Sequence, residues 1–236
     1  MTNNTDQTQR PGLRMNMSEF WSGDLGLTLV TISLTVLIFV ITPLREAGFP
    51  GRLFFDLVFV TLMVSAALTI KQNYLAKVFA VVVVLACAAV LAAGRLHPTP
   101  FLHQLGSSLV VATLLLYVRI VLLVMFRGGP ITWSRIQGGV CAYLLLGMAW
   151  ASAYQLVEQV IPGSFNFVTA PTDIDQLTSK LIYFSFGTLT TVGSSITPLL
   201  PIARSFTIAE AIVGQLFPAT LIGALVAMAM ESRNKS

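Results

Sequence analysis

The stretch Tyr183-Phe-Ser-Phe-Gly-Thr-Leu-Thr-Thr-Val-Gly-Ser-Ser-Ile-Thr-Pro198 runs from apolar residues into Thr, Gly and Ser before a Pro. The apolar segment that leads into it, residues 177–189, is too short to cross a bilayer, because a spanning helix needs about 20 residues. Inside a membrane, a short helix followed by non-helical backbone is tolerated only where protein surrounds it. In a membrane protein, this stretch would therefore form a re-entrant helix and loop.

The rest of the chain has the composition of a membrane protein. Hydrophobic residues occupy 55% of the 236 positions and charged residues 10%, whereas an ordinary soluble domain has roughly a quarter of its residues charged. Six apolar runs approach the length of a spanning helix: 25–44, 53–70, 75–93, 105–126, 136–160 and 206–230. We predict an all-α membrane protein of six transmembrane helices, with the re-entrant helix and loop between the fifth and the sixth.

These runs divide the chain into four parts. We predict an N-terminal tail at 1–24, a four-helix membrane domain at 25–133, a second membrane domain at 134–230 and a C-terminal tail at 231–236. With both tails in the cytoplasm, eight Lys and Arg residues lie on the cytoplasmic side and five outside, as the positive-inside rule favours for a multi-pass protein of the cell membrane. No apolar core lies close to the N-terminus, so we expect no cleavable signal peptide.

The polar loop suggests a chemistry for the re-entrant segment. A cation that leaves water must exchange its hydration shell for fixed oxygens, and rings of backbone carbonyls supply these when copies of one loop meet on an axis. Thr191 adds hydroxyl oxygens, while Val192 and Gly193 can turn their carbonyls inward. One loop cannot encircle an ion, so several copies are needed around the axis. The sequence contains no catalytic triad or metal-ligand set, so we expect no enzyme, and its scattered basic residues predict no nucleic-acid partner.

The segment Thr188-Leu-Thr-Thr191-Val-Gly193 resembles the start of the potassium-channel signature, in which Thr, two variable residues, Thr, Val and Gly precede Tyr-Gly-Asp. Upstream, Tyr143-Leu-Leu-Leu-Gly147 and Pro162-Gly-Ser-Phe165 are similar to the outer helix and turret of bacterial members of this pore-loop family. Downstream, Ala209-Glu-Ala-Ile-Val-Gly-Gln-Leu216 is similar to the start of their inner helix. The resemblance covers residues 134–229 and makes 134–230 the pore domain.

The resemblance implies a potassium-channel-like homotetramer in the lipid bilayer, in which monovalent cations pass passively through one axial selectivity filter. The ion-binding residues of the filter would be Thr190, Thr191, Val192, Gly193, Ser194 and Ser195. Potassium and sodium ions would permeate, and no cofactor or small-molecule substrate is expected.

The chain departs from the family where Ser194, Ser195 and Ile196 replace Tyr-Gly-Asp. A Ser held in the left-handed region costs about 1–2 kcal/mol, so we expect the upper filter to relax to another shape. The lost Tyr also removes a ring that wedges the family's filter against its pore helix, which would leave Tyr183, Phe184 and Phe186 without that partner. We hypothesise weak selectivity among monovalent cations, as in cyclic-nucleotide-gated channels, which also lack Tyr-Gly. The alternative is a non-conducting relative that serves as a structural or regulatory membrane subunit.

Four polar residues near the filter are candidates for a supporting role, and for three of them, Glu210, Asp173 and Asp175, the sequence allows a second interpretation. Thr188 and Glu210 are candidate filter supports, because an acid inside a membrane is costly and usually functional. Glu210 could instead lie at the membrane interface, near the start of the last span. Asp173 and Asp175 could concentrate cations outside, but capping of the short helix is the favoured role, since acids suit a helix N-terminus.

Gating is the least predictable property. Gly214, Pro218 and Gly223 in the last span are hinge candidates, because helix bends arise mostly at Pro and Gly. The same residues could serve close helix packing, and the sequence does not separate the two roles. The predicted fourth span holds only Arg119, whereas steep voltage gating needs more charges.

Overall fold

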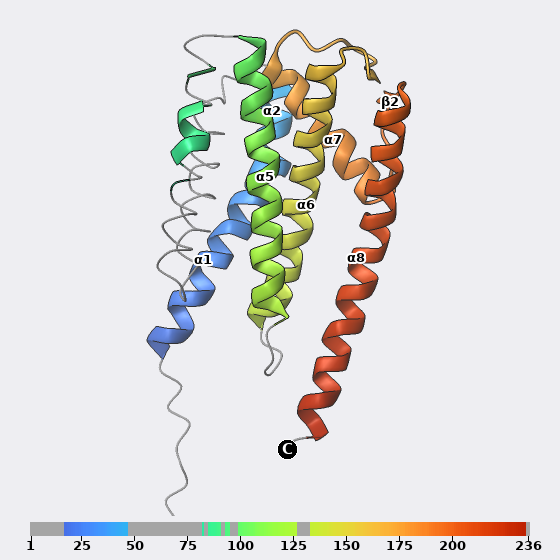
Figure 1. The fold of residues 1–236 in the computed structure, drawn as a ribbon. Helices are drawn as coiled ribbons and strands as arrows, with labels where there is room; N and C mark the ends of the chain where they lie inside the picture. Colours follow the sequence, from blue (N-terminus) through green and yellow to red (C-terminus); the bar gives the residue numbers. More distant parts are fainter. Residues whose placement is uncertain are drawn as a thin grey trace, which may run out of the picture.

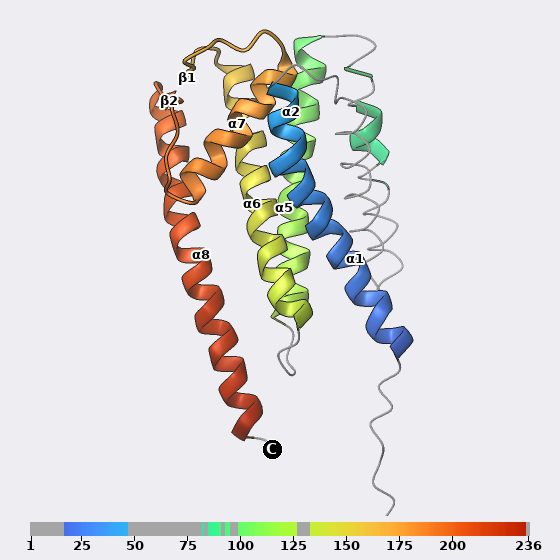
Figure 2. The same cartoon turned by 180° about the vertical axis from the view of Figure 1, so that it is seen from behind.

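The computed structural model of the chain describes residues 17–46, 82, 85–90, 93–94, 99–126 and 133–234. Its named helices are α1 (Met17–Val36), the π-helix η1 (Leu37–Ile41), α2 (Thr42–Glu46), α5 (Pro100–Met125), α6 (Trp133–Val160), α7 (Ile174–Leu189) and α8 (Pro201–Asn234). Two short strands, β1 (Phe165–Asn166) and β2 (Thr197–Pro198), form one antiparallel pair. Helices α5 and α6 run side by side, α1 and α8 are tilted against them, and the shorter α7 slants between α6 and α8 (Figures 1 and 2).

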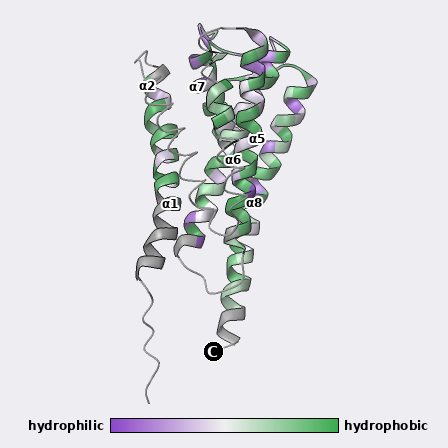
Figure 3. Cartoon of the chain, turned by 60° about the vertical axis from the view of Figure 1, so that its left-hand side comes forward, coloured by the Kyte–Doolittle hydropathy of each residue, from purple (hydrophilic) through white to green (hydrophobic). Residues whose placement is uncertain are grey.

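Among the described residues, four helices are long and apolar enough to cross a membrane: Leu27–Leu44, Pro100–Leu123, Arg135–Val160 and Pro201–Met230. They confirm the spans predicted at 25–44, 105–126, 136–160 and 206–230 as apolar helices. The predicted span at 53–70 lies outside the described residues, and the span at 75–93 is described only in part. Hydrophobic colour dominates the long helices, while hydrophilic colour gathers at the end that carries the α6–α7 connection (Figure 3). The described fold is mostly helical, and only the two-residue strands depart from the all-α prediction.

The first span contains a π-helical segment directly before a proline. Pro43 has no backbone N–H, so an uninterrupted α-helix would leave the carbonyl four residues earlier without its donor. Over Leu37–Ile41 the helix widens, and the backbone N–H and hydroxyl of Thr42 both donate to the Leu37 carbonyl, the hydroxyl at 2.9 Å. Satisfied polar groups are what a bilayer demands of a spanning segment. The helix therefore continues past the proline into α2, which contacts α7.

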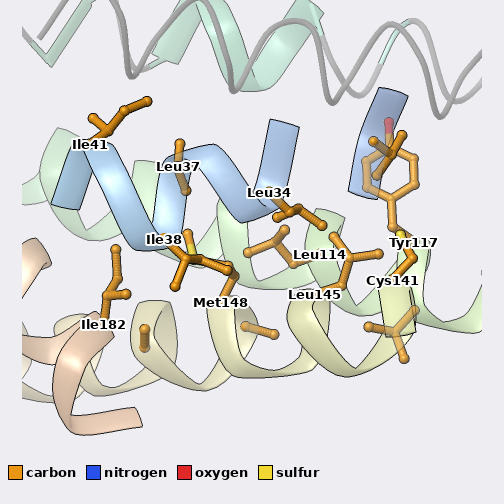
Figure 4. Packing of buried hydrophobic residues seen from close by; sticks show 14 residues of the cluster. Leu34, Leu37, Ile38, Ile41, Leu114, Tyr117, Cys141, Leu145, Met148 and Ile182 are labelled. Carbon is orange, nitrogen blue, oxygen red and sulfur yellow. The ribbon is translucent and has the colours of Figure 1, made fainter. Parts of the chain in front are cut away.

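One hydrophobic core joins the first span to the C-terminal half. Its buried side chains come from the first span, α5, α6 and α7, and include Leu34, Leu37, Ile38, Ile41, Leu114, Tyr117, Cys141, Leu145, Met148 and Ile182 (Figure 4). Cys141 is a buried free thiol and fills space there as a small apolar side chain. Because Ile182 belongs to α7, the first span packs directly against α7.

Truncation of this core should weaken the fold. We expect Leu34→Ala, at a residue with no exposed surface, to lower the free energy of unfolding by about 2–5 kcal/mol, because it removes buried methyl groups and leaves a cavity. Leu29→Ala on the same helix, where the side chain is 52% exposed, is the control and should cost far less. Titration of the detergent-solubilised variants with SDS, followed by circular dichroism, measures the difference. Equal losses would contradict the packing of α1 described here.

Candidate functional site: the loop after helix α7

Helix α7 begins with a side-chain cap. Asp173 has extended backbone, and its carboxylate accepts a 2.8 Å hydrogen bond from the backbone N–H of Gln176. Asp175 lies in the first turn, where a negative charge favours the exposed N–H groups of a helix start. Capping, the favoured role for these acids, is confirmed for Asp173. The helix starts at Ile174, earlier than the predicted residue 177, because this cap sets its first turn.

The backbone folds back on α7 where the helix ends. Thr191 and Gly193 have positive φ values of 60° and 85°. The Thr191 N–H donates to the Thr188 carbonyl at 3.0 Å, and the Gly193 N–H donates to the Gly187 carbonyl at 2.9 Å. A Cβ added at Gly187 would lie 2.6 Å from the Gly193 carbonyl oxygen, so only glycine permits this approach. The candidate filter is thus held by backbone contacts along the last turn of its own helix.

The residues in the middle of the loop are exposed on the surface of the chain. Thr190, Thr191, Val192 and Gly193 are all exposed, and the Val192 side chain has 83% of its surface accessible. Ser195 is also exposed, whereas Ser194 is half-buried. These candidate ion-binding residues form one continuous segment on the open side of the chain.

The three residues that replace Tyr-Gly-Asp take separate roles. Among the described non-glycine residues only Thr191 has a positive φ, so Ser194 and Ser195 avoid the left-handed region, as expected from its cost. The Ser194 hydroxyl accepts a 3.1 Å hydrogen bond from the backbone N–H of Ile196, which closes a small turn. Ile196 is buried and belongs to a hydrophobic cluster behind the loop. The part of the loop whose backbone is hydrogen-bonded to α7 therefore ends at Gly193.

Aromatic side chains occupy the space beside Phe184. The Phe184 ring centroid lies 5.0 Å from that of Tyr154 and 5.4 Å from that of Phe165, both in edge-to-face arrangements. Tyr154 and Phe165 are themselves 5.4 Å apart, and Ile196 packs in the same cluster. Edge-to-face pairs stabilise by about 0.5–1.5 kcal/mol beyond burial. Phe184 lacks the filter tyrosine of the family, but other rings and Ile196 surround it.

The segment after the loop is fixed to the α6–α7 connection. Strand β2 pairs with β1, so that Phe165 faces Pro198, and the Leu199 N–H donates to the Ser164 carbonyl at 2.8 Å. At the end of α6, the Glu158 carboxylate accepts from the backbone N–H groups of Gly163 and Phe165, at 2.8 and 3.1 Å. Both ends of the candidate filter are therefore anchored, one by α7 and the other through this strand pair.

Helix α8 packs directly against the end of α7. Gly214 is buried, and a Cβ placed on it would lie 2.1 Å from the Leu189 carbonyl oxygen, which also accepts a 3.1 Å hydrogen bond from the Tyr143 hydroxyl. Gly214 therefore serves close packing. Pro218 lies within α8, and Gly223 has no atom within 4 Å of an added Cβ. The hinge role of these residues stays a prediction.

Glu210 lies behind the loop, buried among helices α6, α7 and α8. It has no exposed surface, and its carboxyl group contacts the Tyr154 hydroxyl and the Ser185 hydroxyl, each at 2.5 Å. Helices α6, α7 and α8 thus meet at one polar cluster. Thr188 is half-buried and contributes the carbonyl that binds Thr191. The position of Glu210 supports the bracing role predicted for it.

Several residues of this site were not singled out from the sequence. They are Tyr143, Tyr154, Ser185 and Gly187. Ser185 and Gly187 carried a usable signal, because a small polar residue and a glycine inside an apolar helix suggest a hydrogen bond and a close approach. The two tyrosines carried none, since their partners lie far away in the chain.

Comparison with known proteins gives one match. Residues 140–231 match the family model described as "Ion channel", a range that includes most of α6, all of α7, the loop and most of α8. No curated protein and no solved structure matches the chain. The matched range carries an ion-channel pore region of the potassium-channel-like type, in agreement with the resemblance of its loop. The match does not favour a purely structural subunit.

The contact at Gly214 gives a direct test of this packing. We expect Gly214→Ala to lower the free energy of unfolding by about 1–3 kcal/mol, because the new methyl group collides with a backbone carbonyl that cannot rotate away. Gly223→Ala is the matched control, and there we expect no loss or a gain of up to about 1 kcal/mol from helix propensity. SDS titration measures both. A tolerant Gly214→Ala variant would contradict the contact with Leu189.

Proposed function

We propose that the protein is a homotetrameric channel that passes monovalent cations, potassium and sodium, passively and with weak selectivity. The observation that carries this proposal is the exposed loop Thr190–Gly193, which follows a short helix inside a segment that matches an ion-channel family. A single loop of this kind cannot surround an ion. Four copies around an axis would place four loops toward one another, which is why we assign the tetramer.

The loop geometry suits cation coordination. The Gly193 carbonyl oxygen packs against Gly187 of α7, so the carbonyls that would face the axis are those of Thr190, Thr191 and Val192, on the exposed side of the loop. Carbonyl oxygens on that side, together with the threonine hydroxyls, would replace the hydration shell of a dehydrated ion. Helix α7 with its loop would then be a re-entrant element, shielded from lipid by α6, α8 and the neighbouring subunits.

Helix α8 has the exposure expected of an inner helix. Within the most apolar 18-residue stretch of its candidate span Pro201–Met230, only 6% of the residues are buried in the chain, compared with 56% for the corresponding stretch of Arg135–Val160 in α6. The open faces of α8 would meet neighbouring copies and line the inner vestibule. Pro218 and Gly223, within this helix, are the hinge candidates that would let it bend during gating.

The proposed weak selectivity follows from the position at which the loop stops being hydrogen-bonded to α7. Above Gly193, the Ser194 side chain binds the Ile196 N–H, and Ile196 turns into the core behind the loop. The filter would thus offer fewer rings of carbonyl oxygens than one that continues through Tyr-Gly. Ser194 and Ser195 would line a wider outer mouth and contribute hydroxyl oxygens to partly hydrated ions.

The remaining assignments follow from the same topology. We assign six spans in the cell membrane, with both termini in the cytoplasm and lipid as the surrounding partner. Transport down an electrochemical gradient needs no covalent step, so we assign no enzymatic activity and no cofactor.

Reversal potentials test the channel and its selectivity together. Purified protein in planar bilayers, with potassium on one side and sodium on the other, should give currents that reverse near zero. A reversal potential displaced far from zero, in the direction that corresponds to preferred potassium permeation, would overturn weak selectivity. Absence of current from tetrameric wild-type protein would overturn the channel assignment and restore the structural-subunit alternative.

A matched pair of glycine variants assigns the current to the loop. Gly193 and Gly163 have similar positive φ values, 85° and 82°, and neither has an atom within 4 Å of an added Cβ. Alanine at either position carries a similar backbone strain of about 1–2 kcal/mol. We expect Gly193→Ala to abolish most of the current and Gly163→Ala to retain it, with tetramer content checked by size exclusion. Equal currents from the two variants would contradict a filter at Gly193.

A further inference from the structure

Three helices meet at a cluster of four oxygen-bearing groups behind the loop. The Tyr154 hydroxyl of α6 lies 2.5 Å from Oε2 of Glu210 in α8. The Ser185 hydroxyl of α7 lies 2.5 Å from Oε1 of Glu210 and 2.8 Å from the Gly147 carbonyl oxygen of α6. All three side chains are buried with no exposed surface. The cluster therefore contains three short oxygen–oxygen contacts that each require a proton.

Counting protons determines what Glu210 must carry. Tyr154 and Ser185 each have one hydroxyl proton, and the Gly147 carbonyl has none. The Tyr154 proton serves the contact with Oε2, and the Ser185 proton serves the contact with Gly147. The remaining contact, between Ser185 and Oε1, then lacks a proton unless the carboxyl group supplies it.

We infer that Glu210 is a neutral carboxylic acid that donates to Ser185 and so closes a hydrogen-bonded ring through α8, α7 and α6. In this ring, Oε1–H of Glu210 donates to the Ser185 hydroxyl, which donates to the Gly147 carbonyl. The Tyr154 hydroxyl donates back to Oε2 of Glu210. Each of the three contacts then has one proton, and each proton has an acceptor.

The surroundings of Glu210 agree with a neutral group. Within the described part of the chain, no basic side chain forms an ion pair with it, and its partners are the two hydroxyl groups alone. An ionised carboxylate buried without a counter-charge loses its hydration and gains little in return. Tyr154 and Tyr143 of α6 are the titratable side chains that face it, and both are neutral donors at ordinary pH.

The ring gives Glu210 a role as a positioning residue. Ser185 is two residues from Gly187, whose carbonyl binds the Gly193 N–H. The acid on α8 thus holds the part of α7 on which the candidate filter rests. Without the acid proton, the single hydroxyl proton of Ser185 could be donated either to the Gly147 carbonyl or to Glu210. One hydrogen bond between helices would then be lost.

Infrared spectroscopy reads the protonation state directly. At neutral pH, wild-type protein in lipid should show a carboxylic-acid C=O band that shifts in D₂O and is absent from Glu210→Gln. Glu158→Gln is the matched control, because the Glu158 carboxylate accepts from two backbone N–H groups and needs no proton. The band should persist in that variant. A wild-type spectrum without the band, or a band that survives in Glu210→Gln, would overturn the inference.

Cation flux tests the positioning role, and this arm rests on the proposed channel function. Glu210→Gln should conduct within about twofold of wild type, because an amide N–H can replace the acid proton toward Ser185 while the amide oxygen accepts from Tyr154. Glu210→Asp, with a shorter side chain, and Ser185→Ala should each lose about tenfold. A large loss in Glu210→Gln, or none in the other two variants, would overturn the role. Silent wild-type protein with an intact infrared band would overturn the channel alone.

Discussion

The close approach of bare backbone to backbone at the end of α7 is the constraint on which the rest of the site depends. The Gly193 carbonyl packs on Gly187, and Gly214 of α8 packs on the Leu189 carbonyl, in both cases without an intervening side chain. Neither approach would be possible with a Cβ present. These two contacts fix the course of the loop along α7 and the position of α8 beside α7.

The remaining elements hold this arrangement from outside. The Tyr143 hydroxyl adds a hydrogen bond to the same Leu189 carbonyl, and the ring through Glu210 ties α8 to α6. On the far side, the strand pair β1–β2 anchors the chain as it leaves the loop. The first span completes the enclosure, because Pro43 and its π-helical segment carry the chain into contact with α7.

Local patterns predicted a large part of this architecture. The length of the apolar runs predicted the four apolar helices that the structure describes. The short apolar segment 177–189 and the polar residues after it predicted α7 and its loop. The preference of acids for helix starts predicted the Asp173 cap. These signals depend on residues close together in the chain, so the sequence contains them directly.

Contacts between residues far apart in the sequence could not be predicted from these local patterns. The partners Tyr154 and Glu210 lie 56 positions apart, and nothing in either neighbourhood indicates the other. The same holds for Ile196, which stands where the family has a polar filter residue but packs into an aromatic cluster. Its burial depends on β2 pairing with β1, and two-residue strands are too short to leave a pattern. The outer end of the loop was therefore predicted as altered, without its shape.

The glycine contacts also differ in how a genetic lesion at each could be repaired. A methyl group at Gly147 would meet the ring of Phe186, at 2.6 Å from the nearest atom, and a smaller residue at 186 could make room for it. A methyl group at Gly214 or Gly187 would meet a main-chain carbonyl, which every residue type possesses. No exchange of the contacting side chain can suppress such a lesion. In a screen for second-site revertants, Gly147 variants should yield local suppressors, whereas Gly187 and Gly214 variants should yield true reversion.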